Sequence, residues 1–435
     1  MDDHQPKTME CPLSVEEVDL FGPGAAEQWY AAYDILHEDA PVLRLPGEGR
    51  TPEKDAFILT KHEDISLVVK NWERFPPSQS LILDEIRESG KAPRGMAHLD
   101  AMMMSIFTLR PTPELWRAHR KELSDPWVGP GATRHKDMIE GHTEFLIDQW
   151  IDDGEVDLVM QFARPLPQRV MASVLGFPVE DIGLLENWGN AQVMAFVHGR
   201  GHNNILTEEQ TNEKFELLEG FSQYVREKTK EKRANPQDDM VSFLTQVHYE
   251  ALDRKLTDDE INGVVYAMLI GGLETTQYAI TEQAQLVCER PGMFQKLKED
   301  RSLIRTFIEE GMRLRAPTQG LSTRLTSQDE VFQGVKVPAG STLHLRWAAA
   351  NIDPDEFEDA KELKLDRKAA TRHLAFSAGP RVCPGAGISR VEQTIAWNRL
   401  LDRLDDIAYG EDNDFARQPG IMLGTNRLNL TFTKA

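Results

Sequence analysis

Apolar residues recur at every third or fourth position through most of the chain, a spacing that is typical of amphipathic helices. Together with stop signals, this spacing predicts helices at residues 25–37, 113–123, 135–153, 208–232, 238–252, 257–289, 292–299, 304–315 and 386–404. Strand-like runs are few and short, and they lie at 42–44, 56–59, 324–326, 331–335, 342–346 and 428–432. The pattern therefore predicts a fold that is mainly α with a minor β part.

The longest predicted helix starts with a capping box, in which Thr257 is followed three residues later by Glu260. Pro291 ends this helix after about 33 residues, which would span on the order of 50 Å. Gly271 and Gly272 lie in its middle, and each costs about 1 kcal/mol relative to alanine in a helix interior. We expect that the backbone must be bare there to leave room for a ligand.

Composition restricts the class of protein. The 435 residues are 40% hydrophobic and 28% charged, and no run approaches the roughly 18 apolar residues of a membrane span. Residues 1–17 are expected to form a flexible tail and residues 18–435 a single domain. The net charge of −22 argues against nucleic acid and anionic membranes as partners. Three widely spaced cysteines are too few for a disulfide framework, which favours a reducing cytoplasm.

Cys383 lies in a loop rich in Gly and Pro, directly before the helix predicted at 386–404. Backbone N–H groups and the helix N-terminus supply positive potential, which we expect to lower the pKa of the thiol. A thiolate can ligate iron or attack an electrophile, whereas one cysteine cannot form a structural zinc site. A lone buried cysteine is otherwise usually inert packing.

The ten residues that end at Gly385 match F-x-x-G-x-R-x-C-x-G, which resembles the haem-binding loop of the cytochrome P450 family. The resemblance implies one P450 domain, with a long central helix over haem b and with Cys383 as the thiolate ligand of iron. It further implies that Arg381 pairs with a haem propionate and that Phe376 packs near the sulfur. Ser377 departs from the pattern, because a glycine is commoner at this position.

Two further motifs support the resemblance. Glu310 and Arg313 share a helix face, and alone they would usually be a solvated surface pair. Before the Cys loop, this E-x-x-R resembles the family's buried structural pair. The stretch 271–276 resembles the family's oxygen-activation motif, which implies that Thr275 hydrogen-bonds to bound oxygen and that Glu274 relays protons.

Haem propionates also need cations. Trp116 and Arg120 lie four apart and resemble the W-x-x-x-R found before the haem in many family members, while Arg324 is placed as the family places a propionate arginine. A basic patch that docks an acidic ferredoxin is a separate hypothesis. Its expected members are Arg117, Arg120, Lys121 and Arg390.

The implied reaction inserts one oxygen atom of O2 into a substrate C–H bond and reduces the other atom to water. Electrons are expected from NAD(P)H through ferredoxin reductase and ferredoxin, because the chain carries no flavin or iron–sulfur motif. A mostly apolar pocket suits a medium-sized terpenoid, steroid or aromatic substrate. The expected pocket residues are Met194, Val197, Leu269, Gly272, Gly320, Leu321 and Met422. A monomer is expected.

Other interpretations share the Cys loop. Oxidative O-demethylation of a methoxy compound is an alternative reaction, because hydroxylation of a methyl ether gives a hemiacetal that collapses by itself. A peroxygenase or a haem isomerase should lack the Glu274–Thr275 pair. A non-catalytic haem-thiolate carrier or gas sensor is the alternative of another class. His198 and His202 are not expected to bind a metal, because the glycines around them break the helix such a pair needs.

Overall fold

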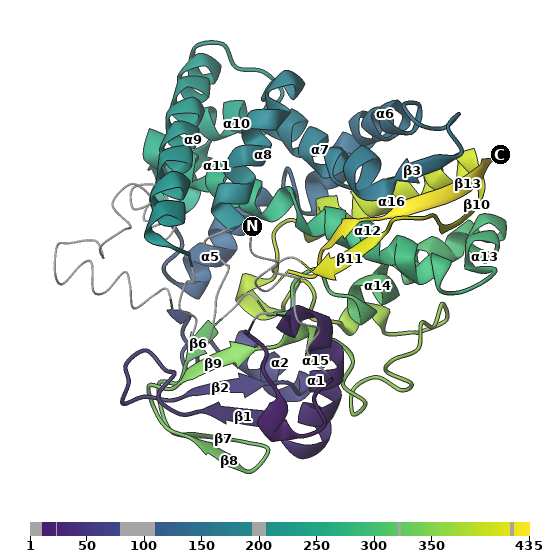
Figure 1. Ribbon diagram of the computed structural model, residues 1–435. Coiled ribbons are helices and arrows are strands. Elements are labelled where there is room, and N and C mark those ends of the chain that lie inside the picture. Colours follow the sequence, from purple (N-terminus) through teal and green to yellow (C-terminus); the bar gives the residue numbers. More distant parts are fainter. Residues whose placement is uncertain (1–10, 23, 79–108, 194–205, 321–322, 418–421) are drawn as a thin grey trace.

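The computed structural model describes residues 11–22, 24–78, 109–193, 206–320, 323–417 and 422–435. Figure 1 shows a large helical part, with a small sheet at the bottom of the view below it. The helices are α1 (Ala25–Asp39), α2 (His62–Lys70), α5 (Pro113–His119), α6 (Lys136–Ile147), α7 (Pro165–Leu175), α8 (Ile182–Val193), α9 (Glu208–Ala234), α10 (Met240–Gln246), α11 (Asp258–Gly272), α12 (Thr275–Cys288), α13 (Met293–Glu299), α14 (Ile304–Leu314), α15 (Trp347–Asn351) and α16 (Ala386–Arg403). The predicted class, mainly α with a minor β part, is confirmed.

The strands are short. They are β1 (Val42–Leu45), β2 (Ala56–Leu59), β3 (Glu155–Asp157), β4 (His248–Tyr249), β5 (Arg254–Lys255), β6 (Thr323–Leu325), β7 (Glu330–Phe332), β8 (Val335–Val337), β9 (Thr342–Leu345), β10 (Leu404–Tyr409), β11 (Asp414–Arg417), β12 (Thr425–Arg427) and β13 (Asn429–Lys434). The largest sheet has the order β1-β2-β9-β6, with only the β2–β9 pair parallel. A second sheet has the order β10-β13-β3.

Three groups of buried apolar side chains hold these parts together. The largest lies among α6 to α14 and α16, and the other two lie between the first sheet and α1, α2 and α15. Within the described part of the chain, no helix combines the length and the apolar character that crossing a bilayer requires. The division into a tail at 1–17 and one domain at 18–435 stays a prediction.

Most helices lie where apolar spacing predicts them. The predictions at 25–37, 208–232, 292–299, 304–315 and 386–404 are confirmed to within two residues at each end. The helix predicted at 135–153 ends at Ile147, and the one predicted at 238–252 ends at Gln246 before strand β4. Helix α7 went unpredicted, because its prolines look like breakers although one occupies the first turn, where proline is tolerated.

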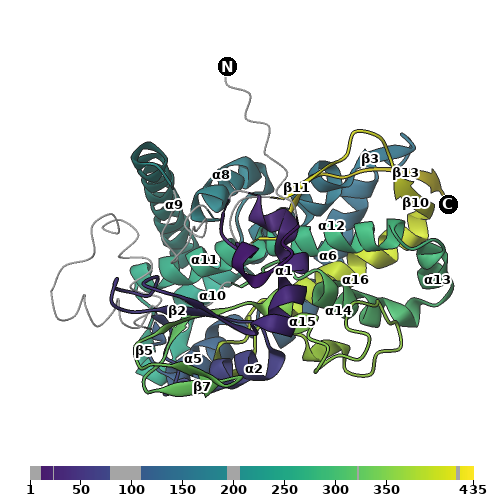
Figure 2. The ribbon, with the colours of Figure 1, turned by 60° about the horizontal axis from the view of Figure 1, so that its bottom comes forward.

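The continuous helix predicted at 257–289 is wrong at one point. The capping box of Thr257 and Glu260 begins α11 as expected, but the helix stops at Gly272 and resumes at Thr275 as α12. The hydroxyl of Thr275 donates to the Gly271 carbonyl at 2.9 Å, which satisfies a backbone group at the interruption. The two helices follow one another across the helical part (Figure 2).

The strand predicted at 331–335 is instead a hairpin of β7 and β8. Gln333 and Gly334 have φ values of 47° and 79°, which form a tight two-residue turn between the strands. The apolar run hid this turn, because Gln333 is not a usual residue at positive φ.

Candidate functional site

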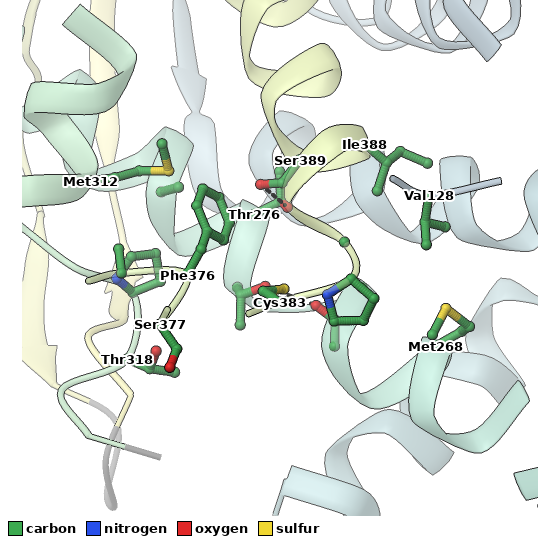
Figure 3. Close-up of a pocket in the computed structure, with 18 of the residues that line it drawn as sticks. Val128, Met268, Thr276, Met312, Thr318, Phe376, Ser377, Cys383, Ile388 and Ser389 are labelled. Atoms are coloured by element: carbon green, nitrogen blue, oxygen red, sulfur yellow. Dashed lines mark hydrogen bonds between the residues drawn. The ribbon is translucent and has the colours of Figure 1, made fainter. Parts of the chain in front are cut away.

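A cavity lies where the break between α11 and α12 meets the Cys383 loop and the start of α16 (Figure 3). Most of its wall is apolar. The apolar lining residues include Val128, Met171, Ala267, Met268, Ala279, Met312, Trp347, Phe376 and Ile388. Cys383 and Thr275 line the same cavity, so the two halves of the predicted site come together.

The Cys383 loop is held by its own backbone. The N–H of Cys383 donates to the Phe376 carbonyl at 2.9 Å. Ser377 has a φ of 58°, in the left-handed region where glycine is favoured, so the departure noted in the sequence is accommodated at a cost in strain. Gly379 has a φ of 70°, and a Cβ there would lie 2.6 Å from the Val69 carbonyl oxygen. The loop therefore packs directly on the end of α2.

The expectation of a lowered thiol pKa is wrong for the protein without its metal. Burial raises the pKa of Cys383, and this effect outweighs the hydrogen bonds from the backbone of Gly385 and Ala386 and the charges of Arg120 and Arg390. Desolvation disfavours a thiolate that no cation neutralises. A cation bound at the sulfur would offset this cost, because a metal ion stabilises the thiolate that coordinates it.

Charged groups behind the loop brace Phe376. Arg390 lies 4.6 Å from the centroid of the Phe376 ring and donates to Glu309 at 2.6 Å and 2.9 Å. His373 also contacts Glu309, at 2.9 Å. Although burial alone would raise it, the pKa of Glu309 is held at about 2 by Arg390 and His373.

The E-x-x-R pair is fully buried. Arg313 donates to both carboxylate oxygens of Glu310, at 2.6 Å and 3.0 Å, and neither side chain has exposed surface. Arg313 also binds the carbonyls of Asn351 and Glu362, and Arg367 lies 2.9 Å from Glu310. The pair therefore joins α14 to α15 and to the segment before the Cys383 loop, as a structural role requires.

Three arginines gather beside the cavity, of which Arg324 is buried and Arg110 and Arg381 are half-buried. Trp116 lies between Arg110 and Arg381, whose guanidinium carbons are 4.0 Å and 4.4 Å from its ring centroid. Burial lowers the pKa of Arg110 and of Arg324 to about 9, and the charge of Arg381 adds to both shifts. Burial lowers the pKa of Arg381 to about 10. Buried like charges are costly unless an anionic group joins them.

This cluster fits a ligand that carries carboxylates. The Nε of Arg110 is buried and has no hydrogen-bond partner in the described structure. The two propionates of haem would supply negative charge to this cluster, and Cys383 would supply the iron ligand. The sequence drew attention to Trp116, Arg324 and Arg381 but missed Arg110, which precedes Trp116 by six residues and belongs to no motif.

Arg120 does not join this cluster. It donates to the Val382 carbonyl at 2.9 Å and to Asp125 at 3.1 Å, so it holds the Cys383 loop from behind. Gly385 lines the cavity beside the sulfur, where a Cβ would lie 3.8 Å from the Cys383 Sγ.

Glu274 lies at the helix break but is not among the residues that line the cavity. Its carboxylate accepts a hydrogen bond from the Tyr278 hydroxyl at 3.0 Å. Burial raises the pKa of Glu274, while Tyr278 and the charge of Arg164 oppose the rise. The carboxyl group is half-buried, and its raised pKa means that it holds a proton more readily than an exposed glutamate does.

The predicted pocket residues divide into three groups. Gly272 lines the cavity as expected, but a Cβ there would meet the Met171 side chain at 2.6 Å, whereas a Cβ at Gly271 would meet nothing within 4 Å. The cavity is therefore widened by Gly271, and Gly272 allows α11 to approach α7. The residues that do not line this cavity are Leu269, Gly320 and Met422. The residues that lie outside the described part of the chain are Met194, Val197 and Leu321.

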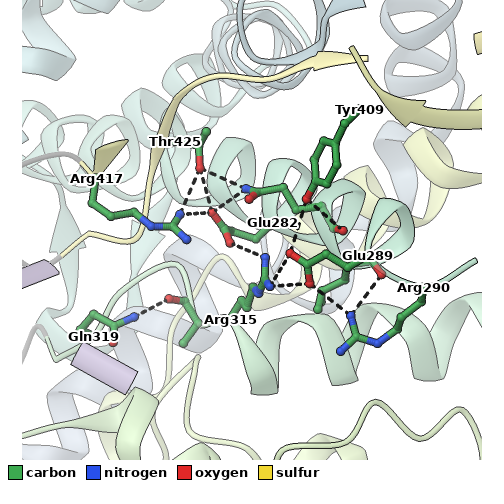
Figure 4. Close-up of polar contacts among 11 residues, drawn as sticks. Glu282, Glu289, Arg290, Arg315, Gln319, Tyr409, Arg417 and Thr425 are labelled. Atoms are coloured by element: carbon green, nitrogen blue, oxygen red, sulfur yellow. Dashed lines mark hydrogen bonds and ion pairs between the residues drawn. The ribbon is translucent and has the colours of Figure 1, made fainter. Parts of the chain in front are cut away.

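Helix α12 is fixed by a polar network on its far side (Figure 4). Glu282, with 1% of its side chain exposed, binds Arg417 of β11 and accepts from Thr425 of β12 at 3.2 Å. Arg315 bridges Glu282 at 3.3 Å and Glu289 at 2.6 Å. The hairpin of β11 and β12 is thereby anchored on the helix that carries Thr275.

Two features of the cavity wall were not predicted from the sequence. Thr276 donates to Ser389 at 3.0 Å, which links α12 to α16 across the cavity (Figure 3). Glu392 lines the cavity with 1% of its surface exposed, and burial raises its pKa well above 4.5. A glutamate in a helical pattern is ordinarily a surface residue, so only the packing of α16 shows that it is buried.

Comparison with known proteins identifies the family and the fold. The family model for cytochrome P450 matches residues 202–432. The polyketide biosynthesis cytochrome P450 PksS of Bacillus subtilis is 29% identical over 420 residues, which cover 95% of this chain and 99% of that protein. The steroid C26-monooxygenase of Mycolicibacterium smegmatis is 28% identical over 312 residues, 70% of this chain and 75% of that protein.

A solved structure agrees in fold. The epothilone D-bound cytochrome P450epoK superposes with a TM-score of 0.81 at 23% identity, over 96% of this chain and 99% of that chain. The chain belongs to the cytochrome P450 family. It is a haem-thiolate monooxygenase, and members of this family use haem b, O2 and electrons from NAD(P)H that arrive through redox partners.

Proposed function

We propose that this protein hydroxylates a C–H bond of a medium-sized, mostly apolar small molecule, such as a terpenoid, a steroid or an aromatic compound. The observation that carries the proposal is the apolar cavity that Cys383 and Thr275 line together. The mostly apolar wall and the open space at Gly271 favour a substrate held by burial of apolar surface. The names of the two relatives, a polyketide biosynthesis enzyme and a steroid monooxygenase, agree with such a substrate.

The chain's own residues have distinct parts in this proposal. Cys383 is the iron ligand, Phe376 and Gly385 shape the space around its sulfur, and Arg324 and Arg381 with Trp116 hold the haem carboxylates. Haem b, when bound, supplies the chemistry that activates O2. Arg110 joins the carboxylate-binding group, and Arg120 keeps the Cys383 loop in place through the Val382 carbonyl.

Proton delivery is assigned to the residues at the break between α11 and α12. The Thr275 hydroxyl donates to the Gly271 carbonyl at the break, and Thr275 lines the cavity. In this proposal it is the side chain that contacts O2. Glu274, the preceding residue, binds protons outside the cavity and releases them toward Thr275. Arg164 and Glu186 form a partly exposed ion pair that acts electrostatically on this carboxylate, and in this proposal they connect it with solvent.

A ferredoxin, reduced by a ferredoxin reductase, is the proposed electron donor. Three members of the expected basic patch already have acidic partners in the structure, namely Arg117 with Glu114, Arg120 with Asp125 and Arg390 with Glu309. The patch hypothesis is therefore weakened, and the proposal depends on the family's need for an external donor. A cytoplasmic location stays a prediction.

The decisive experiment is the absorption spectrum of the dithionite-reduced protein with carbon monoxide. The wild type and Cys288→Ser should show the red-shifted Soret band of a haem thiolate, and Cys383→Ser should lose it. Cys288 is the matched control, because it is a half-buried cysteine that does not line the cavity. A normal haem band in the wild type would overturn the assignment.

The substrate class is tested separately. Apolar terpenoids, steroids and aromatics should displace water from the iron and shift the Soret band. Failure of all of them, with tight binding of a charged sugar or acid, would refute an apolar substrate while leaving the haem-thiolate assignment intact.

A further inference from the structure

Tyr278 lies one helical turn after Glu274, so the two side chains share a face of α12. The Tyr278 hydroxyl donates to Oε2 of Glu274 at 3.0 Å, and 6% of Tyr278 is exposed. Neither residue lines the cavity, whereas Thr275 between them does. The hydrogen bond therefore keeps the carboxylate beside the cavity and outside it.

The Tyr278 ring is fixed from the C-terminal side. A Cβ at Gly424 would lie 2.4 Å from Cε1 of the ring, so only glycine allows this close approach. Met422 packs on the same ring and pairs with Thr318, which lines the cavity. The ring is held between α12 and this segment, and its hydroxyl has little freedom to leave Glu274.

The charged and titratable groups that act on Glu274 come from three elements. Tyr278 lies on α12, Arg164 lies directly before α7, and Glu186 lies on α8. Arg164 and Glu186 bind each other, with 25% and 31% of their side chains exposed. Tyr278 is the one of these groups with a hydrogen bond to the carboxylate in the described structure.

We propose that Tyr278 is a positioning residue for proton delivery, because its hydroxyl holds the Glu274 carboxylate in place between one proton transfer and the next. In each cycle, Glu274 releases a proton into the cavity near Thr275 and regains one from water at the Arg164–Glu186 pair. Tyr278 keeps its own proton throughout, since burial and the adjacent carboxylate raise its pKa. The inference rests on the proposed relay role of Glu274.

Tyr278→Phe tests the inference. Loss of the hydroxyl removes a donor that stabilises the charged carboxylate, so the pKa of Glu274 should rise by about one unit. An infrared titration of the substrate-free protein, with Glu274→Gln subtracted to assign the carboxyl band, measures this shift without turnover. In turnover, the limb of the pH profile that disappears in Glu274→Gln should move to higher pH by the same amount.

Tyr409→Phe is the matched control. The Tyr409 hydroxyl lies 3.4 Å from Glu289 directly after the end of α12, which makes it a second tyrosine–glutamate pair far from the cavity. This control should change neither the band nor the pH profile. In a Glu274→Gln background, Tyr278→Phe should have no further effect on the product formed per NAD(P)H consumed.

The outcomes separate the two proposals. If Glu274→Gln leaves the product yield and the pH profile unchanged, the relay role itself is wrong. If Glu274→Gln alters both while Tyr278→Phe moves neither the infrared band nor the profile, the relay stands and the inference about Tyr278 is overturned. A uniform loss of activity at every pH, with an unmoved band, would show a merely structural role and would also overturn it.

Discussion

The Nε of Arg313 lies 2.6 Å from Oε1 of Glu310, and both side chains are completely buried. Glu310→Gln would leave the Arg313 charge buried without its counter-charge. We expect the free energy of unfolding to fall by about 3 kcal/mol or more. Urea denaturation followed by tryptophan fluorescence measures this loss.

The exposed pair of Glu114 and Arg117 provides the control, because it has the same i,i+3 spacing and a contact of 2.9 Å, but its side chains are 72% and 59% exposed. Glu114→Gln should change the free energy of unfolding by less than about 0.5 kcal/mol. Equal losses in the two variants would contradict the claim that burial makes the Glu310 pair structural.

Backbone conformation in the Cys383 loop gives a second prediction. Ser377→Gly should stabilise the loop by about 1 kcal/mol, since it relieves a left-handed conformation at a residue with a Cβ. Gly379→Ala should destabilise it, because strain at φ 70° is added to a contact of 2.6 Å with the Val69 carbonyl. Ser377→Gly should raise both the haem content and the denaturation midpoint, and Gly379→Ala should lower both.

Gly334→Ala is the control that separates backbone strain at positive φ from the steric contact made by the added Cβ. Gly334 also has a positive φ, of 79°, but a Cβ there would meet nothing within 4 Å. This variant should lose about 1 kcal/mol from strain alone and keep its haem. If Gly379→Ala behaved in the same way, the packing of the loop on α2 would not matter for haem binding.

Local signals made much of this fold predictable. Apolar spacing and a capping box located α9, α14, α16 and the start of α11, because each buries one face and has a recognisable start or stop. The loop around Cys383 was found because its residue types are specific. Ser377 was noted as unusual, and its positive φ gives the physical reason.

Features that depend on tertiary contacts could not be found in this way. Arg110 acquires its place only when Trp116 and Arg381 come together, and the close packing at Gly272 exists only because Met171 of another helix lies against it. The prediction of a lowered thiol pKa for Cys383 was wrong because it took account of local dipoles but not of burial, which raises the pKa.

A lower pH should weaken the contacts of Glu309 with Arg390 and His373, which lie behind Phe376. Burial alone would raise the pKa of Glu309, but Arg390 and His373 hold it at about 2, below the usual 4.5. A depressed folded-state pKa gives stability that is present above about pH 4.5 and is lost as the pH falls toward 2. The ionised group contributes up to about 3 kcal/mol at neutral pH by this linkage.

Glu309→Gln isolates this contribution from other acids. The difference in free energy of unfolding between wild type and variant should be largest near neutral pH and should shrink as the pH falls toward 2. A difference that stays constant over this range would show that the charge of Glu309 does not stabilise the fold.

The two glycines at the end of α11 should respond in opposite ways to an added methyl group. Gly272→Ala forces a Cβ to within 2.6 Å of the buried Met171 side chain, so the free energy of unfolding should fall by about 1–3 kcal/mol. In a chain that also carries Met171→Ala, the total loss should be smaller than the sum of the two single losses, because the shortened side chain leaves room for the added methyl group. Gly271→Ala meets nothing and should keep or slightly increase stability, because alanine favours helix. Its methyl group would narrow the cavity instead, so apolar ligands should bind several-fold more weakly, as measured by the shift of the Soret band. A loss of stability at Gly271 with unchanged ligand binding would show that the cavity does not open at this residue.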